Sequence, residues 1–280
     1  MIEQVRPCWR LLETGPGDGC TNMAVDEALL EVYAAGAASP TLRFYTWSPP
    51  AVSLGYGQAT EADIDLAQCQ ALGIDVVRRT TGGRAVLHDH EVTYSVVIRE
   101  DDPRAAAGIL ASYLTISRAL IRGLSHLGIS AELLPLRGAA SRSREAVSPI
   151  CFATPSSYEV AVAGRKIIGS AQRRAHGVIM QHGSIPMSLD LDKLSAVLGS
   201  PNSAHRARPM AVDYQTRMTS LQEAGGRLYD YAEVVAALSR GFADTWEVEL
   251  ITGELTAEEK RLSAYLRATK YGSDAWTWHR

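Results

Sequence analysis

The segment RRTTGGRAVLHDHEVTYSV, residues 78–96, decides the fold. It predicts the end of a strand that starts in DVVRR (75–79), then a diglycine turn, and then strands in RAVLHD (84–89) and from EVTYSV onward (91–98). Two adjacent glycines, Gly82 and Gly83, allow a backbone to approach a ligand closely or to adopt positive φ. The hydrogen-bond donors around them are Arg78, Arg79, Arg84 and His88. A ligand-binding loop and a simple turn with exposed arginines both fit this pattern.

Further strands lie on either side of this segment. Residues 42–47 and 51–56 are aromatic and β-branched runs separated by a proline turn. Residues 157–174, SYEVAVAGRKIIGSAQRR, alternate around AGR like a β-hairpin, and residues 177–185 predict one more strand. These strands form clusters instead of alternating regularly with helices.

Helical spacing of apolar residues predicts helices before and after the strands. The clearest are residues 21–35 and 103–127, the second ending at Gly128. Further helices are expected near residues 231–240 and 257–269. Strand clusters flanked by helices predict an α+β fold with a mixed β-sheet.

Charge and hydropathy exclude several classes of protein. The 280 residues carry a net charge of −3, which argues against a general nucleic-acid binder. No apolar stretch is long enough for a membrane span and the N-terminus lacks a signal-peptide pattern, so we expect a soluble cytoplasmic protein. Residues 137–208 nevertheless carry six more basic than acidic side chains. This region fits either a solvated loop surface or a docking surface for an acidic partner.

Several chemical motifs are absent from the sequence. It contains no GxGxxG, GxxxxGK[ST], GxSxG or HExxH pattern and no CxxC pair. In HDH, residues 88–90, only His88 and His90 would share one face of a strand, and nothing nearby completes a metal site. We therefore expect no metal.

A long segment rich in Ser, Ala, Pro and Arg, residues 135–157, predicts a loop that carries Cys151. The loop leads directly into the hairpin that carries Lys166, one of only four lysines against 24 arginines. A thiol with a pKa of about 8.5 is mostly protonated at pH 7, and a nearby cation favours the thiolate. Cys151 fits both a nucleophile and a small buried hydrophobe. Cys8, Cys20 and Cys69 are interpreted as inert.

Five stretches, in order along the chain, resemble the lipoate–protein ligase A and octanoyltransferase family, and within it the octanoyltransferases of Gram-positive bacteria. They are NMAVDEALL (22–30), RFYTWSPPAVSLGYGQ (43–58), residues 78–96, CFATPSSYEVAVAGRKIIGSAQRR (151–174) and KYGSDAWTW (270–278). The resemblance implies a biotin/lipoate-ligase-like catalytic domain over residues 1–250, with a mixed β-sheet flanked by helices. Residues 251–280 would add a short helical extension.

The resemblance also implies a reaction and its partners. An octanoyl group would pass from octanoyl-acyl carrier protein to the ε-amine of a lysine on the lipoyl domain of the glycine cleavage H protein. A cysteine thioester would be the intermediate, no cofactor would be needed, and the enzyme is expected to be a monomer. Acyl carrier proteins and lipoyl domains are typically acidic, so they would suit the basic region 137–208.

Carried over to this sequence, the family pattern assigns Cys151 as the nucleophile and Lys166 as the activating lysine. The residues expected to bind the substrate are Arg79, Thr81, Gly82, Gly83, Arg84, His88, Gly169, Ser170 and Gln172.

Three alternatives remain open. An ATP-dependent lipoate ligase uses the same lysine without the cysteine and often adds a C-terminal accessory domain, for which the residues after Lys270 are too few. A lipoyl-domain amidotransferase also has a Cys–Lys pair, but its motifs are less similar. A non-catalytic acyl-binding protein would not need the pair at all. Trp276 and Trp278 would either pack back on the domain or form a lid over the acyl site.

Overall fold

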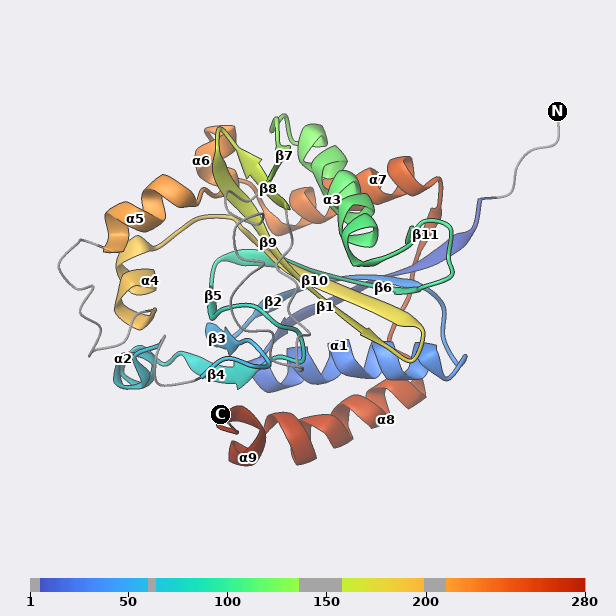
Figure 1. Cartoon of the computed structure of the whole chain (residues 1–280), viewed down its shortest axis with the longest axis horizontal. Coiled ribbons are helices and arrows are strands. Elements are labelled where there is room, and N and C mark those ends of the chain that lie inside the picture. Colours follow the sequence, from blue (N-terminus) through green and yellow to red (C-terminus); the bar gives the residue numbers. More distant parts are fainter. Residues whose placement is uncertain (1–5, 60–63, 136–157, 199–209, 280) are drawn as a thin grey trace, which may run out of the picture.

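An eight-stranded mixed sheet forms the centre of the molecule (Figure 1). The computed structural model describes residues 6–59, 64–135, 158–198 and 210–279. The strand order is β11-β1-β2-β6-β10-β9-β8-β7, in which β1 runs parallel to β2 and β11 and the remaining neighbours are antiparallel. The strands are β1 Cys8–Gly17, β2 Thr41–Trp47, β6 Glu91–Arg99, β7 Glu132–Pro135, β8 Tyr158–Val162, β9 Arg165–Ala175, β10 Val178–Pro186 and β11 Glu249–Thr252. The expected α+β fold with a mixed sheet is confirmed.

Helices cover both faces of this sheet. The pair α3 Ile109–His126 and α7 Tyr231–Trp246 packs on one face, and α1 Gly19–Ala34 packs on the other (Figure 1). A central strand covered on both sides should be apolar throughout. In agreement, every residue of β6 except its last is buried.

A smaller three-stranded sheet lies beside the central one and carries the diglycine segment. Its order is β4-β3-β5, with bounds Asp75–Arg78, Ala51–Leu54 and Val86–His88. Residues 79–85, which contain Gly82 and Gly83, connect β4 to β5 and are called the cavity loop below. The short helices at this end of the molecule are α2 Leu66–Ala71, α4 Leu191–Val197, α5 Met210–Arg217 and α6 Leu221–Gly225.

The last residues pack back onto the body of the protein. Helix α8, Ala257–Leu266, lies along α1, and a π-helical turn, Arg267–Tyr271, leads into α9, Asp274–Thr277 (Figure 1). The indole of Trp276 reaches the main chain of β4. Of the two arrangements considered for this tryptophan, packing on the domain is the one observed.

Several boundaries differ from the sequence prediction. The second long helix begins at Ile109, six residues later than expected, because Gly108 precedes it with a φ of 92° that a helix does not allow. Strands β7 and β11 and helices α4 to α6 were not predicted, since each is short. Apart from Pro135, which ends β7, the expected loop 135–157 lies outside the described residues.

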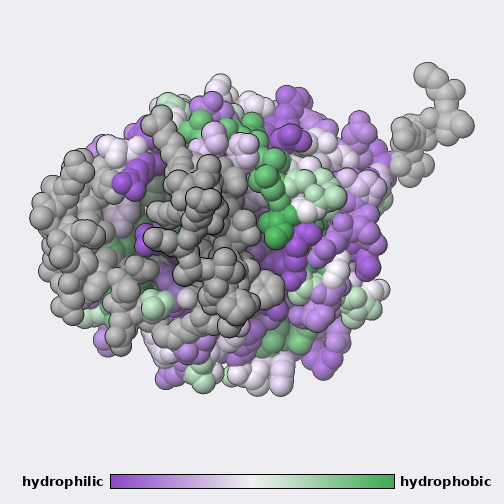
Figure 2. All heavy atoms as spheres, in the orientation of Figure 1, coloured by the Kyte–Doolittle hydropathy of each residue, from purple (hydrophilic) through white to green (hydrophobic). Residues whose placement is uncertain are grey.

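Within the described ranges, no helix combines the length and apolar character needed to cross a bilayer. On the face shown in Figure 2, hydrophobic atoms outside the grey residues form small separate patches among hydrophilic ones.

Candidate active site

A cavity of about 860 Å³ opens between the small sheet and the strands β6, β9 and β10. Its size falls in the range typical of small-molecule sites. The described residues that line it include Met23, Tyr45, Trp47, Ser53, Arg79, Gly82, Gly83, Arg84, His88, Glu91, Thr93, Lys166, Gly169, Ser170, His182, Gly183, Ser184, Arg217 and Met218. Many of these residues carry polar groups, but most of the surface that they expose to the cavity is apolar, as expected for a site that binds an organic ligand.

Most residues expected at the substrate site line this cavity. They are Arg79, Gly82, Gly83, Arg84, His88, Lys166, Gly169 and Ser170. Thr81 is buried behind this wall and contacts the lining residue His182. Gln172 follows Ser170 on β9 but is not part of the lining; its side chain meets Gln181 and Ser112. Cys151 lies outside the described residues.

The Arg79 guanidinium shapes the cavity loop from within. Its Nη1 donates to the carbonyl of Ser53 at 2.7 Å, and its Nη2 donates to the carbonyls of Gly82 and Arg84 at 2.8 Å each. Burial, together with the neighbouring charge of Arg78, lowers the pKa of Arg79 to about 10, so the side chain remains charged at neutral pH. The Arg79 side chain thus ties both sides of the cavity loop to β3 by hydrogen bonds to main-chain carbonyls.

Gly55 and Gly83 both need to be glycine, Gly55 because of a close backbone approach and Gly83 because of its backbone conformation. A Cβ added at Gly55 would lie 2.0 Å from the carbonyl oxygen of Gly83, and Gly83 itself has a φ of +99°. A side chain would strain either position. The segment predicted as either a binding loop or a plain turn is therefore a tightly packed loop that forms one wall of the cavity.

The imidazole of His88 is fixed on three sides. Nδ1 lies 2.8 Å from Glu91 Oε1, Nε2 lies 2.8 Å from Ser53 Oγ, and the ring stacks on Trp47 with 4.0 Å between centroids. Glu91 also accepts hydrogen bonds from the hydroxyls of Thr93 and Ser184. Burial alone would raise the pKa of Glu91, but His88 and the two hydroxyls outweigh it and lower the pKa below its usual range.

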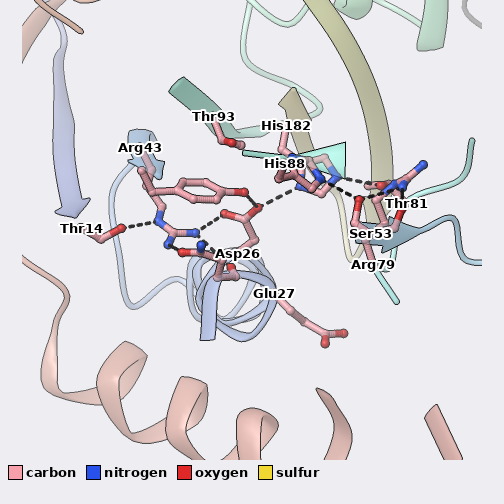
Figure 3. A network of polar contacts seen from close by, with 12 residues as sticks. Thr14, Asp26, Glu27, Arg43, Ser53, Arg79, Thr81, His88, Thr93 and His182 are labelled. Atoms are coloured by element: carbon pink, nitrogen blue, oxygen red, sulfur yellow. Dashed lines mark hydrogen bonds and ion pairs between the residues drawn. The ribbon is translucent and has the colours of Figure 1, made fainter. Parts of the chain in front are cut away.

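A second buried network holds His182 on β10 (Figure 3). Its Nδ1 lies 2.9 Å from Asp26 Oδ2, and its Nε2 lies 2.7 Å from Thr81 Oγ1. Asp26 also forms an ion pair of 2.7 Å with Arg43 and accepts a hydrogen bond from the Tyr45 hydroxyl. Burial opposes ionisation, but Arg43 and then His182 reverse this and lower the pKa of Asp26.

The two histidine networks form a polar floor of the cavity in which both nitrogens of each imidazole have a hydrogen-bond partner. Each imidazole has a carboxylate on one nitrogen and a hydroxyl on the other. Such fully satisfied networks rigidify a site. Of this floor, only His88 and Thr81 had been predicted from sequence. The sequence does single out Asp26 and Arg43, because each is a charged residue within an otherwise mostly apolar segment.

Lys166 brings a primary amine to the cavity wall. The residue is the second of β9, and its Nζ forms a 2.7 Å ion pair with Glu159 on β8. Its main-chain carbonyl accepts a hydrogen bond of 2.9 Å from the N–H of Thr219. The side chain is about one-third exposed, so it is accessible from the cavity. An amine in such a place can take or give a proton.

Two of the described cysteines, Cys20 and Cys69, have a raised pKa. Burial raises the pKa of Cys20, with a further contribution from Asp18, and burial also raises the pKa of Cys69. Both shifts disfavour the thiolate. Cys8 is exposed on β1, which contributes no residue to the cavity lining. Among the described residues, no group of three or more His, Cys, Asp or Glu side chains is arranged to hold a metal ion.

The chain matches the family of the lipoyl protein ligase A/B catalytic domain over residues 18–243. Octanoyltransferase LipM of Moorella thermoacetica is 47% identical over 268 residues, covering 96% of this chain and 97% of the relative. Octanoyltransferase LipM of Brevibacillus brevis is 41% identical over 274 residues, covering 97% and 99%.

Solved structures resemble the fold over equally long stretches. A bipartite lipoate protein ligase from Thermoplasma acidophilum, studied with its E2 lipoyl domain, has a TM-score of 0.81 at 29% identity and covers 97% of this chain and 96% of its own. A lipoate-protein ligase A bound with ATP has a TM-score of 0.78 at 29% identity and covers 98% and 99%.

Proposed function

The chain belongs to the lipoyl protein ligase A/B catalytic domain family, and on this premise we propose that it transfers octanoyl groups to lipoyl domains through Cys151. Its relatives along nearly the whole chain are octanoyltransferases, so it is an acyltransferase of the protein lipoylation family. The single observation that carries the finer proposal is the position of Lys166, whose amine lies at the wall of the cavity formed by the cavity loop.

The donor in this proposal is octanoyl-acyl carrier protein, and the acceptor is a lysine on the lipoyl domain of the glycine cleavage H protein. One similar structure pairs a ligase of this fold with a lipoyl domain, which supports the acceptor class. The basic excess of residues 137–208 supports both partners, because electrostatic complementarity favours encounter with acidic proteins.

The first half-reaction loads the enzyme. The Cys151 thiolate attacks the carbonyl carbon of the donor thioester, a new C–S bond forms, and the bond to the carrier thiol breaks. Lys166 gives its proton to the departing thiolate and becomes a neutral amine. One thioester replaces another, so this step is nearly thermoneutral. Each CH₂ of the acyl chain buried in the cavity contributes about 0.8 kcal/mol to binding.

The second half-reaction makes the amide. An acceptor lysine arrives protonated, because an ordinary lysine has a pKa of about 10.4. Neutral Lys166 takes one proton from it, and the freed amine attacks the thioester carbonyl and expels the Cys151 thiolate. The second proton of the nitrogen leaves to solvent. Lys166 is charged again at the end of the cycle, and the overall reaction proceeds downhill from thioester to amide.

A second candidate function is the ATP-dependent ligation of free acid. The observation in its favour is the structural likeness to lipoate protein ligases, one of them bound with ATP. The ligases share 29% identity with this chain, whereas octanoyltransferase relatives share 38–47%. The transferase is therefore the better supported function.

Residues 251–280 are proposed to be a helical extension of one catalytic domain, 1–250. In support, α8 packs along α1, and the buried carboxylate of Glu259 on α8 forms a 2.5 Å ion pair with Arg10 on β1.

The test is an assay of the lipoyl domain by mass. Purified enzyme is mixed with octanoyl-acyl carrier protein and an H-protein lipoyl domain without ATP, and in parallel with free octanoate and ATP. We expect an octanoylated lipoyl domain in the first mixture only, unchanged in Cys69→Ser and lost in Cys151→Ser. Product formed only with ATP and free acid would instead identify a ligase.

A further inference from the structure

The ammonium of Lys166 is paired with a carboxylate that does not itself line the cavity. Nζ lies 2.7 Å from Glu159 Oε1, and both side chains are about one-third exposed. Glu159 belongs to β8, the antiparallel neighbour of β9, and is not among the described lining residues. The carboxylate therefore reaches the amine from outside the cavity and would not touch an acyl group bound there.

The register of the hairpin puts the two side chains on one face. Lys166 pairs with Ala161, and Glu159 lies two residues before Ala161 on the same strand. Alternate residues of a strand share a face, so Glu159 is the diagonal neighbour of Lys166. A register shift follows at once, because Val160 pairs with Ile168 instead of Ile167. Bulges of this kind commonly aim side chains next to active sites.

Gly169 leaves space for the lysine on its other side. A Cβ built at Gly169 would lie 3.4 Å from Lys166 Cε and 3.9 Å from Nζ, so the end of the lysine side chain passes directly over this glycine. Gly169 lines the cavity. The amine thus sits between the carboxylate of Glu159 and the cavity wall.

The main chain below the lysine is also held. Lys166 forms an isolated β-bridge with Met218, and its carbonyl accepts the N–H of Thr219. With the backbone fixed in this way, the remaining freedom of the amine lies in the four rotatable bonds of its side chain. A charge-assisted hydrogen bond is the interaction best able to select one of their arrangements.

We propose that Glu159 is a positioning residue for Lys166, holding Nζ at the cavity wall and stabilising the ammonium that the lysine becomes after it accepts a proton. The inference rests on the proposed function insofar as Lys166 serves the acyl transfer. An ion pair that is partly exposed to solvent in this way adds little to fold stability. Removing the Glu159 carboxylate should therefore lower kcat and leave the stability of the fold nearly unchanged.

The adjacent residue of β9 offers a matched control. Arg165 forms a 2.5 Å ion pair with Glu223 of α6, and neither of these side chains lines the described cavity. Glu223→Gln therefore removes a more exposed carboxylate from a neighbouring pair; Glu223 accepts a hydrogen bond from the Thr219 hydroxyl but does not contact the Lys166 side chain. Comparing Glu159→Gln with Glu223→Gln distinguishes a rate lost because Lys166 is misplaced from a rate lost because any nearby carboxylate is removed.

The experiment measures kcat, the acceptor KM and the melting temperature for wild type, Glu159→Gln, Glu159→Asp and Glu223→Gln. Misplaced catalytic groups cost up to about a hundredfold in rate, and for Glu159→Gln we expect kcat to fall about ten- to a hundredfold. The acceptor KM and the melting temperature should stay near wild type. Glu159→Asp should recover part of the rate because it restores the charge, and Glu223→Gln should match wild type.

Two results would overturn the inference: a wild-type kcat in Glu159→Gln, or an equal loss in Glu223→Gln. Failure of the proposed function is seen separately, in the wild-type enzyme. If wild type forms product only with ATP and free octanoate, kcat of Glu159→Gln is compared with that of wild type in the ATP-dependent reaction. An unchanged kcat in that reaction also overturns the role of Glu159. A wild-type protein inactive in both reactions overturns both proposals.

Discussion

The indole Nε1 of Trp276 donates a 2.9 Å hydrogen bond to the carbonyl oxygen of Arg78, and Arg78 Nε in turn donates, also at 2.9 Å, to the carbonyl of Thr277. This reciprocal contact joins α9 to the end of β4, directly before the cavity loop. Arg78 is completely buried and also donates to the carbonyls of Gly55 and Gln58. The C-terminal residues therefore support the base of the loop that forms one wall of the cavity.

Removing the Trp276 hydrogen bond should destabilise the protein. Trp276→Phe keeps an aromatic ring but leaves the Arg78 carbonyl without this donor, and we expect a loss of about 1 kcal/mol in the free energy of unfolding. Urea denaturation measures it. Trp278→Phe is the control, because the Trp278 indole donates only to the exposed side chain of Asp274. Equal urea midpoints for the two variants would show that the contact is not stabilising.

Acid should weaken the attachment of the C-terminal residues to α1. Glu27 points away from the Asp26 network (Figure 3) and binds Lys270 Nζ at 2.7 Å, the Tyr271 hydroxyl at 2.8 Å and Arg173 at 3.0 Å. Burial raises the pKa of Glu27, but Lys270 and then the other donors outweigh it, so the pKa is lowered in the folded protein.

The lowered pKa fixes the direction of the pH dependence. The folded protein binds the Glu27 proton less readily than the unfolded chain, whose glutamates have a pKa of about 4.3. The stability from Glu27 is therefore complete above that pH and is lost as pH falls through the lower folded pKa. We expect Glu27→Gln to melt at a lower temperature at pH 7 and to lose less on acidification to pH ~3 than wild type does. Parallel pH curves for the two proteins would contradict this account.

The Asp26–Arg43 pair should be essential for the fold. Asp26→Asn leaves the fully buried Arg43 guanidinium without its opposite charge, and breaking such a buried pair costs about 3–5 kcal/mol. Chemical denaturation measures the loss. Asp101→Asn, which removes an exposed partner of Arg99, should leave stability unchanged. If both variants unfold like wild type, the buried network contributes nothing to stability.

Two glycines of the cavity wall should respond differently to alanine. A Cβ at Gly183 would lie 2.5 Å from a ring carbon of Tyr94 and 2.6 Å from the carbonyl of Gly169, so backbone must move. We expect Gly183→Ala to lose about 1–3 kcal/mol of stability and most acyl transfer. Gly169→Ala makes only ordinary contacts and should melt like wild type. Similar melting of both variants would show that the wall is not closely packed at Gly183.

Local patterns in the sequence were enough to predict the elements that position the site. Helix α1 and the β8–β9 hairpin follow from apolar spacing and from alternation around a glycine turn, because both depend on residues close in the chain. The start of α3 was wrong by six residues, since turns occupy the stretch before Gly108 despite its helical spacing. Short strands such as β11 depend on partners far along the chain and leave almost no local pattern.

The cavity loop was recognisable from its glycines and arginines, but its supporting networks were not. Asp26, Arg43 and His182 come from three separate elements and meet only in the folded protein. Their pairing depends on tertiary packing, which no spacing rule encodes. Glu159 was missed for a related reason: its relation to Lys166 depends on the exact register and bulge of the hairpin.

The central claim, acyl transfer through Cys151, is tested most directly by the mass of the enzyme itself. The protein is incubated with octanoyl-acyl carrier protein, without ATP and without an acceptor, and its intact mass and peptide map are recorded. We predict one octanoyl group, located on Cys151, present in Cys69→Ser and absent in Cys151→Ser. An unmodified enzyme that nevertheless octanoylates a lipoyl domain when one is added, or an octanoyl group on another residue, would contradict the claim.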